Sequence, residues 1–501
     1  MSRTDVLRRT GPDTAKPAAV FDRDTEWEAL TVFTRDPRPA PGLGVVTGRL
    51  RQGKTYLLEA LTRSLDGFYF GAQEAAGAES LNRLGDRLAL HTGTASTDRP
   101  RTWEEAVDAL LALGDRRPLP VVVDEFPHLV RQCPALPSAV HGAYRRLRDE
   151  GRGNRARLLL CGSDLPVMRR LFSRPSPLHG LADLELEVRP LDFRRAAEFW
   201  GIGDPRLALR VHAIAGGTPA YRRDLVRGDA PAGPDDFDAW VCRTVLDPRT
   251  PVFWEAQHLL QEETDHPDRA LCHSALAAVA LGRTTAGGVA GHLDTGLADV
   301  SRCLELLRAR ALLSCEPDAF RPGLTRLRIA EPLLAFEHAV VWPRRSELEQ
   351  EDAADVWRRA RALFDTAVAA PHFAQVCREW AVGFAAPDTF GAEPFTASHG
   401  SLSRPEPGAA ADAEVVVRGA RTGDRPGALL SVGSACWNET MDLPHLERLR
   451  RLLDLLAARG EDTARARPAC YGGAGFTPAL REAEARGDVV LVGPDRLYRG
   501  R

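Results

Sequence analysis

The stretch that decides the fold is residues 48–55, which read Gly48-Arg49-Leu50-Arg51-Gln52-Gly53-Lys54-Thr55. It follows a short apolar run at 44–47 and precedes a segment with helical spacing at 55–65. Glycines in such a turn let backbone amides converge on phosphate oxygens at the positive end of a helix dipole. Lys54 is expected to contact the β- and γ-phosphates, and the Thr55 hydroxyl is expected to bind Mg²⁺. The pattern therefore predicts a nucleotide-binding P-loop, with ATP and Mg²⁺ as its ligands.

A second acidic motif lies about seventy residues further on. Residues 118–125 read PLPVVVDE, a β-branched strand that ends in Asp124 and Glu125. Parallel sheets bind their ligands at the carboxyl ends of the strands. We expect Asp124 to hold the metal and Glu125 to act as the base or to orient the attacking water. The alternative is an acidic pair that only caps the helix after the strand.

The use of lysine points to the same site. Lysine and arginine total 66, yet only two are lysines, Lys16 and Lys54. Arginine cannot replace lysine where a compact, rotatable ammonium is needed, and this favours a chemical role for Lys54. Lys16 falls in residues 1–18, which we interpret as a disordered leader.

Strands and helices alternate from residue 21 to about residue 225, which predicts a parallel sheet covered by helices, and we place the P-loop core at 19–190. The chain resembles the archaeal-type prokaryotic ATPase family, AAA+-like P-loop proteins of the STAND group. Besides the two motifs above, the resemblance rests on residues 21–26 (FDRDTE), 160–163 (LCGS), 176–180 (SPLHG) and 216–221 (GGTPAY). It implies a helical lid at 191–239.

The resemblance also adds residues to the site. It implies that Ser163 is the polar sensor after the next strand, although a serine there could equally satisfy only the local backbone. We also assign Arg23 and Tyr56 to the nucleotide site. Leu181 stands where the family usually has an arginine that stabilises the transition state, so hydrolysis is expected to be slow. Arg169, Arg170 and Arg174 are the nearby candidates to replace that arginine.

Residues 240–345 predict a winged helix, with helices at 271–281, 284–292 and 297–310 and a hairpin from 311–314 and 325–329. The third helix would be the one that reads DNA. However, residues 265–345 hold ten arginines against nine acidic residues, whereas DNA-binding domains usually have a clear basic excess. DNA contact and an intramolecular or protein-binding role both stay open.

The resemblance implies a nuclease-like α/β domain at 360–501. Glu379 and Glu414 match its metal-binding acids. The segment 433–437, however, reads GSACW where the family has a glutamate and a lysine. A metal-dependent nuclease needs a cluster of hard oxygen ligands, so we expect an inactive domain. We predict a long loop at 393–411, helices at 372–384 and 444–459, and strands at 413–417 and 429–432.

Composition sets the remaining expectations. The formal net charge is −3, and nine cysteines are scattered from Cys133 onwards without a CxxC pair. No run of about 18 apolar residues is present, so no membrane span is expected. We predict a cytoplasmic, ATP-binding α/β protein that acts as a slow Mg²⁺-dependent ATPase switch. The alternatives are an ATP-dependent DNA-processing protein and a scaffold that hardly hydrolyses ATP, with a protein partner or a second copy of the chain as binding partner.

Overall fold

A computed structural model describes residues 15–94, 99–149, 153–263, 269–402, 411–421 and 426–500. The chain divides into two compact units, residues 1–189 and residues 190–501, and each is described by itself. Most of the segment predicted as a leader, residues 1–14, lies outside the described residues. Within the described residues, no helix is both long and apolar enough to cross a membrane.

The first unit is built on a five-stranded, wholly parallel sheet in the order β2-β3-β4-β1-β5. The strands are β1 (Gly42–Thr47), β2 (Phe68–Gly71), β3 (Leu119–Asp124), β4 (Ala156–Gly162) and β5 (Leu184–Glu187). The helices are α1 (Asp24–Thr34), α2 (Lys54–Ser64), α3 (Gly77–Thr92), α4 (Trp103–Ala112), α5 (Phe126–Gln132), α6 (Leu136–Asp149) and α7 (Leu165–Phe172). The predicted α/β fold with a parallel sheet is confirmed.

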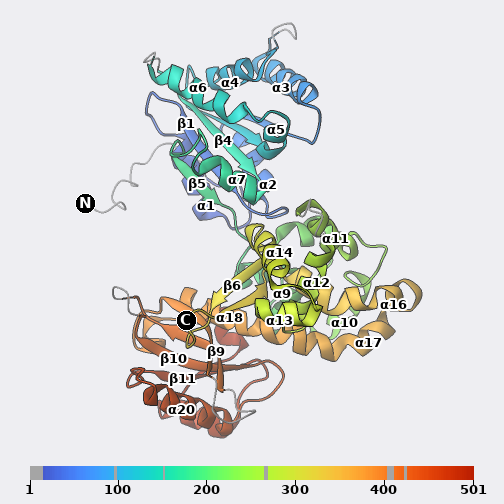
Figure 1. Cartoon of the computed structure of the whole chain (residues 1–501), viewed down its shortest axis with the longest axis vertical. Coiled ribbons are helices and arrows are strands. Elements are labelled where there is room, and N and C mark those ends of the chain that lie inside the picture. The colour runs from blue at the N-terminus through green and yellow to red at the C-terminus, as the bar shows by residue number, and fades with distance from the viewer. Residues whose placement is uncertain are drawn as a thin grey trace. The chain divides into compact units, whose positions relative to one another are not determined.

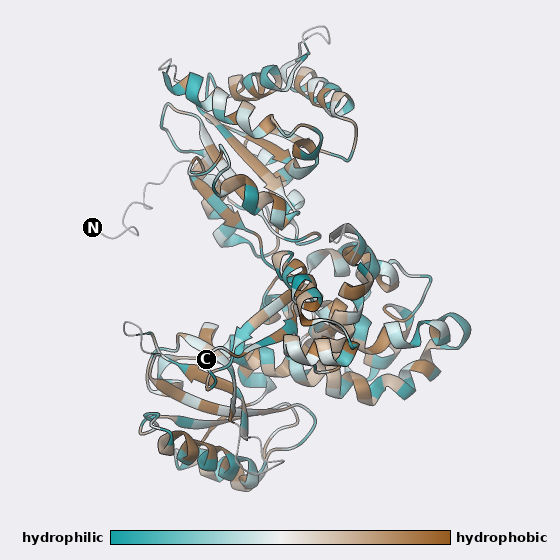
Figure 2. Cartoon of the chain, in the orientation of Figure 1, coloured by the Kyte–Doolittle hydropathy of each residue, from teal (hydrophilic) through white to brown (hydrophobic). Residues whose placement is uncertain are grey.

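Helices cover both faces of this sheet (Figure 1). On one face, α1 and α2 bury residues such as Leu30 and Leu61 against Val122 and Leu159 of the central strands. On the other face, α3 to α7 pack against a larger cluster that includes Val121 and Leu158. Successive strand side chains point to opposite faces, so the central strands, which are buried on both sides, consist mainly of apolar residues, as their colour in Figure 2 shows.

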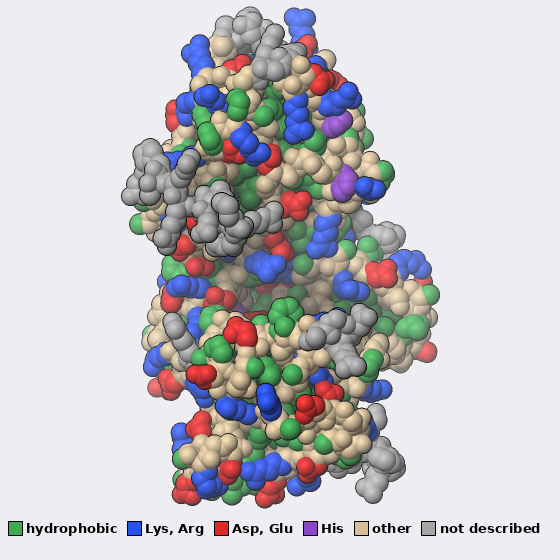
Figure 3. Space-filling view, turned by 90° about the vertical axis from the view of Figure 1, so that its left-hand side faces the viewer, with side chains coloured by type: hydrophobic (Ala, Val, Ile, Leu, Met, Phe, Trp, Pro, Cys, Tyr) green, Lys and Arg blue, Asp and Glu red, His purple; other side chains and the backbone are tan. Residues whose placement is uncertain are grey.

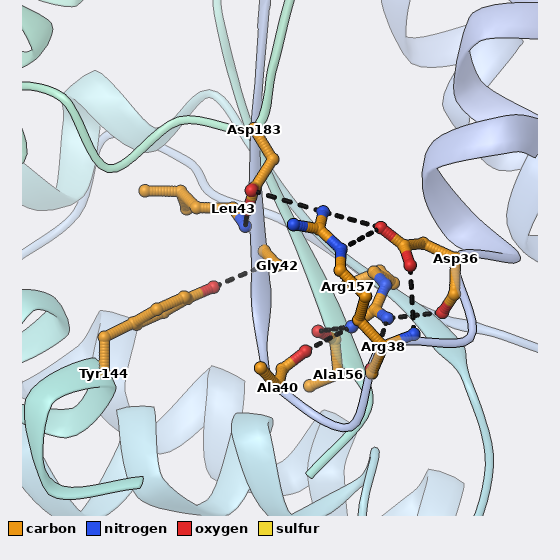
Figure 4. A network of polar contacts seen from close by, with 9 residues as sticks. All are labelled: Asp36, Arg38, Ala40, Gly42, Leu43, Tyr144, Ala156, Arg157 and Asp183. Atoms are coloured by element: carbon orange, nitrogen blue, oxygen red, sulfur yellow. Dashed lines mark hydrogen bonds and ion pairs between the residues drawn. The ribbon is translucent and has the colours of Figure 1, made fainter. Parts of the chain in front are cut away.

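A buried arginine fixes the start of β1 (Figure 4). Arg157, at the beginning of β4, donates hydrogen bonds to the carbonyl oxygens of Ala40 (2.7 Å), Arg38 (3.0 Å) and Asp36 (2.5 Å), and to that of Ala156 (3.1 Å). A buried guanidinium needs such partners, because an unpaired buried charge is costly. The network holds residues 36–40, and the strand that follows them leads directly to the P-loop.

The second unit begins with helices and short turns. These are α8 (Phe193–Trp200), α9 (Pro205–Ala215), η3 (Tyr221–Leu225), η4 (Pro234–Asp236), α10 (Phe237–Arg243) and α11 (Pro251–Glu263). Three further helices and an antiparallel hairpin follow in the predicted order: α12 (Arg269–Ala280), α13 (Ala286–Leu293), α14 (Leu297–Ala309), β6 (Leu313–Pro317) and β7 (Thr325–Ile329).

A helical stretch then leads to a second sheet. It comprises α15 (Pro332–Phe336), η5 (Glu337–Val341), η6 (Trp342–Arg344), α16 (Arg345–Gln350), α17 (Ala353–Leu363), η7 (Phe364–Ala369), α18 (Ala370–Gly383) and α19 (Pro387–Phe390). The sheet has the order β12-β11-β10-β9-β8. Its elements are β8 (Thr396–Leu402), β9 (Ala411–Arg418), β10 (Leu429–Cys436), α20 (Leu443–Ala458), β11 (Arg467–Gly472), α21 (Pro478–Ala485), β12 (Val490–Val492) and α22 (Pro494–Arg499).

The predicted loop at 393–411 is wrong for residues 396–402, which form β8. This strand reads TASHGSL and lacks the β-branched, alternating pattern that identifies strands. It forms because β9 offers it an antiparallel backbone partner. The part of the predicted loop at 403–410 lies outside the described residues.

The tip of the β6–β7 hairpin docks on β8. The Asp318 carboxylate, whose side chain is 0% exposed, accepts hydrogen bonds from the Ser401 amide (3.1 Å) and hydroxyl (2.8 Å). The Ala319 amide donates to the His399 carbonyl at 2.8 Å. Although burial raises the pKa of Asp318, the hydrogen bonds from Phe320 and Ser401 outweigh it and hold the pKa below the usual value. The hairpin is therefore tied to the second sheet.

Candidate functional site: the P-loop at the carboxyl edge of the first sheet

The strand order brings the predicted motifs together. In the parallel pairings, Thr47 of β1 lies opposite Gly162 of β4, and Asp124 of β3 lies opposite Gly71 of β2. Since β4 lies between β1 and β3, the segment after β4 starts between the ends of the strands that lead into the P-loop and into the acidic pair. Ser163 therefore occupies the centre of this edge, between two motifs that are far apart in sequence.

Backbone geometry explains two of the P-loop glycines. Gly48 has φ +152° and Gly53 has φ +91°, conformations that side chains disfavour. A Cβ on Gly48 would also stand 2.4 Å from the Val188 carbonyl oxygen. Arg51 adopts φ +66° as well. This tightly turned segment leads directly into α2, whose first residue is Lys54.

Lys54 is buried, with only 4% of its surface exposed. Its ammonium donates a hydrogen bond to the Arg49 carbonyl oxygen at 2.8 Å. An ammonium buried at this depth requires polar partners, and the loop carbonyl is one of them. The side chain thus folds back over the loop at residues 48–53, close to the amino end of α2, where an anion is favoured.

Thr55 and Asp124 lie in direct contact. The Thr55 hydroxyl donates to Asp124 Oδ2 at 2.6 Å, and the Tyr69 hydroxyl donates to the same oxygen at 2.8 Å. Asp124 is 2% exposed, whereas Thr55 is exposed. Burial, with the neighbouring Asp124 carboxylate, raises the pKa of Tyr69, so this phenol stays a hydrogen-bond donor. The hydroxyl and the carboxylate form a pair of hard oxygen atoms of the type that Mg²⁺ prefers.

Glu125 is held by Ser163. Its Oε2 atom accepts hydrogen bonds from the Ser163 amide at 3.1 Å and from the Ser163 hydroxyl at 2.9 Å. Glu125 has φ +50°, a conformation that costs of order 1–3 kcal/mol for a residue with a side chain. The bond from its own amide to Asp124 Oδ1 (2.9 Å) helps to maintain it. Both carboxylates therefore have defined orientations.

The remaining residues predicted to bind the nucleotide surround the loop. Arg23 donates to the Gln52 carbonyl at 3.2 Å and to Glu26 at 3.0 Å. The Tyr56 hydroxyl donates to the Ala19 carbonyl at 3.1 Å. Arg49 and Gln52 are buried, and Leu50 and Arg51 are half-buried.

Sequence reasoning missed Tyr69. This tyrosine lies in a four-residue strand, FYFG, whose composition says nothing about its neighbours. The parallel pairing of β2 with β3 is what carries it to Asp124.

The acids predicted in the second unit do not form a comparable site. Glu414 Oε2 accepts from the Ala435 amide at 3.1 Å, while Glu379 accepts from Gln375 at 3.0 Å. The buried Arg378 guanidinium lies beside them and donates to the Glu414 carbonyl at 2.9 Å. Burial raises the pKa of Glu414. No group of three or more His, Cys, Asp or Glu that could hold a metal ion occurs among the residues that the structure describes.

Comparisons with known proteins find distant similarity. No protein-family model matches the sequence. A curated relative, the uncharacterized protein MJECL04 of Methanocaldococcus jannaschii, is 22% identical over 311 residues, which is 61% of this chain and 65% of that protein. The chain thus spans slightly less than two thirds of this relative.

Solved structures with a similar chain course include the Walker-type ATPase paby2304 of Pyrococcus abyssi, with 20% identity and a TM-score of 0.49 over 66% of this chain and 99% of that one. The ORC2 protein of Aeropyrum pernix has 17% identity and a TM-score of 0.44 over 70% of this chain and 97% of that one.

Proposed function

We propose that this protein binds MgATP at the cradle formed by residues 48–55 and hydrolyses it slowly, as an ATP-dependent switch. The observation that carries the proposal is the hydrogen bond from Thr55 Oγ1 to Asp124 Oδ2, 2.6 Å long. Thr55 directly follows Lys54, which is buried. A P-loop lysine, a metal-binding hydroxyl and a strand-end carboxylate are the parts that phosphoryl transfer requires in P-loop proteins.

The residues present fit a magnesium ion. Thr55 Oγ1 and Asp124 Oδ2 supply two hard oxygen atoms, and Mg²⁺ commonly takes one or two protein ligands with phosphate and water as the rest. When bound, the ion neutralises charge on the phosphates. The protein's own contribution is to hold these two oxygen atoms in place, and Tyr69 supports Asp124 from the neighbouring strand.

Glu125 is the residue that we assign as the base. Its carboxylate is oriented by two donors of Ser163, so one carboxylate oxygen is fixed before any nucleotide arrives. The Lys54 ammonium has three donors. It can therefore replace its hydrogen bond to the Arg49 carbonyl with hydrogen bonds to phosphate oxygens. Leu181 supplies no charge where the family has an arginine, and this is why we propose slow turnover.

The winged-helix region is assigned an intramolecular role rather than DNA reading. On α14 the exposed residues Asp299, Arg302, Glu305 and Arg308 balance in charge, and Arg302 pairs with Asp299 at 2.7 Å. The hairpin tip is tied to β8 through Asp318. On the face drawn in Figure 3, acidic and basic side chains are interspersed, whereas DNA-binding surfaces gather positive charge.

The nuclease-like region is proposed to be inactive. Its key strand carries Ser434 and Cys436 in place of a carboxylate and a lysine, and the neighbouring Arg378 supplies positive charge where a metal ion would need ligands. A plasmid-cleavage assay with Mg²⁺ or Mn²⁺ tests this, and the expected result is no cleavage.

Calorimetry with MgATP tests the proposed function. The wild-type protein should bind, and Lys54→Ala should weaken binding by about 100-fold, because a buried charge contact is lost. Lys54→Arg is a second test variant: it keeps the charge, but its planar guanidinium does not fit the place of the ammonium, so binding should also fall. Glu125→Gln should bind ATP normally and lose turnover. Absence of binding heat in the wild-type protein would refute the proposal.

The switch is tested by hydrogen exchange. If nucleotide binding is reported to the second unit, exchange in residues 269–329 should differ between MgATP and MgADP. Identical exchange in the two states would leave an ATPase without the proposed switch.

A further inference from the structure

Lys16 is one of only two lysines in the chain, and it makes ordered contacts although the sequence places it in the leader. We propose that Lys16 is a positioning residue for the nucleotide site, and that it acts by shaping the turn at residues 17–24 that supports the P-loop. This inference rests on the proposed function and deepens it: Lys16 touches no reacting atom and works through Arg23.

The Lys16 ammonium has three acceptors. It donates to the carbonyl oxygens of Val20 at 2.7 Å and Asp22 at 2.5 Å, and it lies 3.4 Å from the Asp24 carboxylate. Its side chain is 18% exposed while that of Asp24 is 76% exposed. An ammonium has three rotatable donors, so one lysine can gather three acceptors around a single point.

The turn that it gathers has an unusual backbone. Asp22 has φ +55° and Arg23 has φ +69°, two consecutive residues in the left-handed region that side chains disfavour. Such a conformation persists where the surroundings impose it. Lys16 binds the carbonyls on either side of Phe21, and Val20 is anchored in the core at 3% exposure. The ammonium and the core together impose the turn.

This turn makes two contacts with the nucleotide-binding segment. Arg23 donates to the Gln52 carbonyl at 3.2 Å, and the Ala19 carbonyl accepts from Tyr56 of α2 at 3.1 Å. Because the peptide unit is planar and trans, holding the Gln52 carbonyl also fixes the direction of the next N–H group, that of Gly53. In a P-loop that amide belongs to the cradle which receives the phosphates. Lys16 therefore acts on the cradle through two intervening groups, the Arg23 side chain and the Gln52 carbonyl.

Arginine cannot perform this task. Its guanidinium is a planar fork whose donors point outward in one plane, whereas the acceptors of Lys16 surround one nitrogen. In a chain that uses arginine for nearly every cation, lysine remains at the two places where a compact ammonium contacts loop carbonyls, Lys16 and Lys54.

The experiment compares Lys16→Arg and Lys16→Met with the wild-type full-length protein. The control is Arg63→Met, which removes an exposed cation of α2 that pairs only loosely, at 3.5 Å, with Glu59. Both Lys16 variants should raise the KM for MgATP and its calorimetric Kd about tenfold, with kcat within twofold, because the cradle is displaced while Glu125 and Ser163 are not. The Arg63 variant should match the wild type.

Hydrogen exchange without nucleotide supplies the second measurement. In both Lys16 variants, exchange should rise in peptides covering 17–24 and 48–53 and stay unchanged in 77–92. Two results would overturn the inference. One is a rate of hydrogen exchange at 48–53 in Lys16→Arg that equals the wild-type rate, and the other is an equal rise in exchange throughout residues 15–189. If the wild-type protein fails to bind MgATP, the proposed function fails. The hydrogen-exchange result still decides whether Lys16 keeps the turn at 17–24 in contact with the loop at 48–53.

Discussion

Replacing Arg157 by methionine should destabilise the first unit strongly. The change keeps much of the apolar stem but removes the guanidinium that bonds to four carbonyl oxygens (Figure 4). A hydrogen bond from a charged donor contributes about 1.5–3 kcal/mol. The contributions do not add, since water can reach residues 36–40 once they loosen. We expect a loss of about 3–5 kcal/mol, because four carbonyl oxygens lose a charged donor and hydrogen bonds of this kind contribute about 1.5–3 kcal/mol each without adding fully.

The assay is hydrogen exchange of the full chain under native conditions, because a protein of two units has no single free energy of unfolding. Protection in β1 and β4 should fall together, while β9 to β11 keep wild-type protection. Arg38→Met is the control, since Arg38 is 64% exposed and its ion pairs with Asp36 and Asp183 lie at the surface. It should cost under about 1 kcal/mol. Equal effects of the two substitutions would refute the reasoning.

Three further outcomes are expected. Ser163→Ala removes the hydrogen bond from the hydroxyl to Glu125 (2.9 Å) but leaves the hydrogen bond from the backbone amide. The kcat for ATP hydrolysis should therefore fall about tenfold, with KM within twofold of the wild-type value. An unchanged kcat in steady-state assays would contradict the role of Ser163. Burial lowers the pKa of His212, which contacts His372 at 2.7 Å, to about 4. The unfolded chain therefore binds more protons between pH 6.5 and 4, and stability of the second unit should fall by up to about 3 kcal/mol as pH drops through that range. His212→Gln should reduce this dependence when the stability of the second unit is followed by hydrogen exchange, and an unchanged slope would count against it. Asp318→Ala leaves the Ser401 amide and hydroxyl without their acceptor, so hydrogen exchange in β8 and in the 318–324 turn should rise. Protection equal to that of the wild type would show that Asp318 does not hold the hairpin on β8.

Local chemistry determined much of the first unit. The pattern at 48–55 predicts a turn followed by a helix, and β1 and α2 lie on either side of that turn. The β-branched run before Asp124 predicts a buried strand, which the structure confirms as β3. These features are readable because backbone freedom at glycine and the packing of β-branched side chains depend on neighbours within a few residues. The roles assigned to Lys54, Thr55, Asp124 and Glu125 stay predictions until nucleotide binding is measured.

Only the tertiary structure decided which distant residues meet. Placing β4 between β1 and β3 brings Ser163 to Glu125, and pairing β2 with β3 brings Tyr69 to Asp124. Neither contact leaves a trace in composition, because strand order is set by the packing of whole helices and strands. The same holds for β8, which needs β9 as a partner, and for Lys16, whose acceptors exist only after the chain has turned. The sequence by itself determined the pieces of the proposed phosphate cradle, and long-range backbone pairing decided what surrounds them.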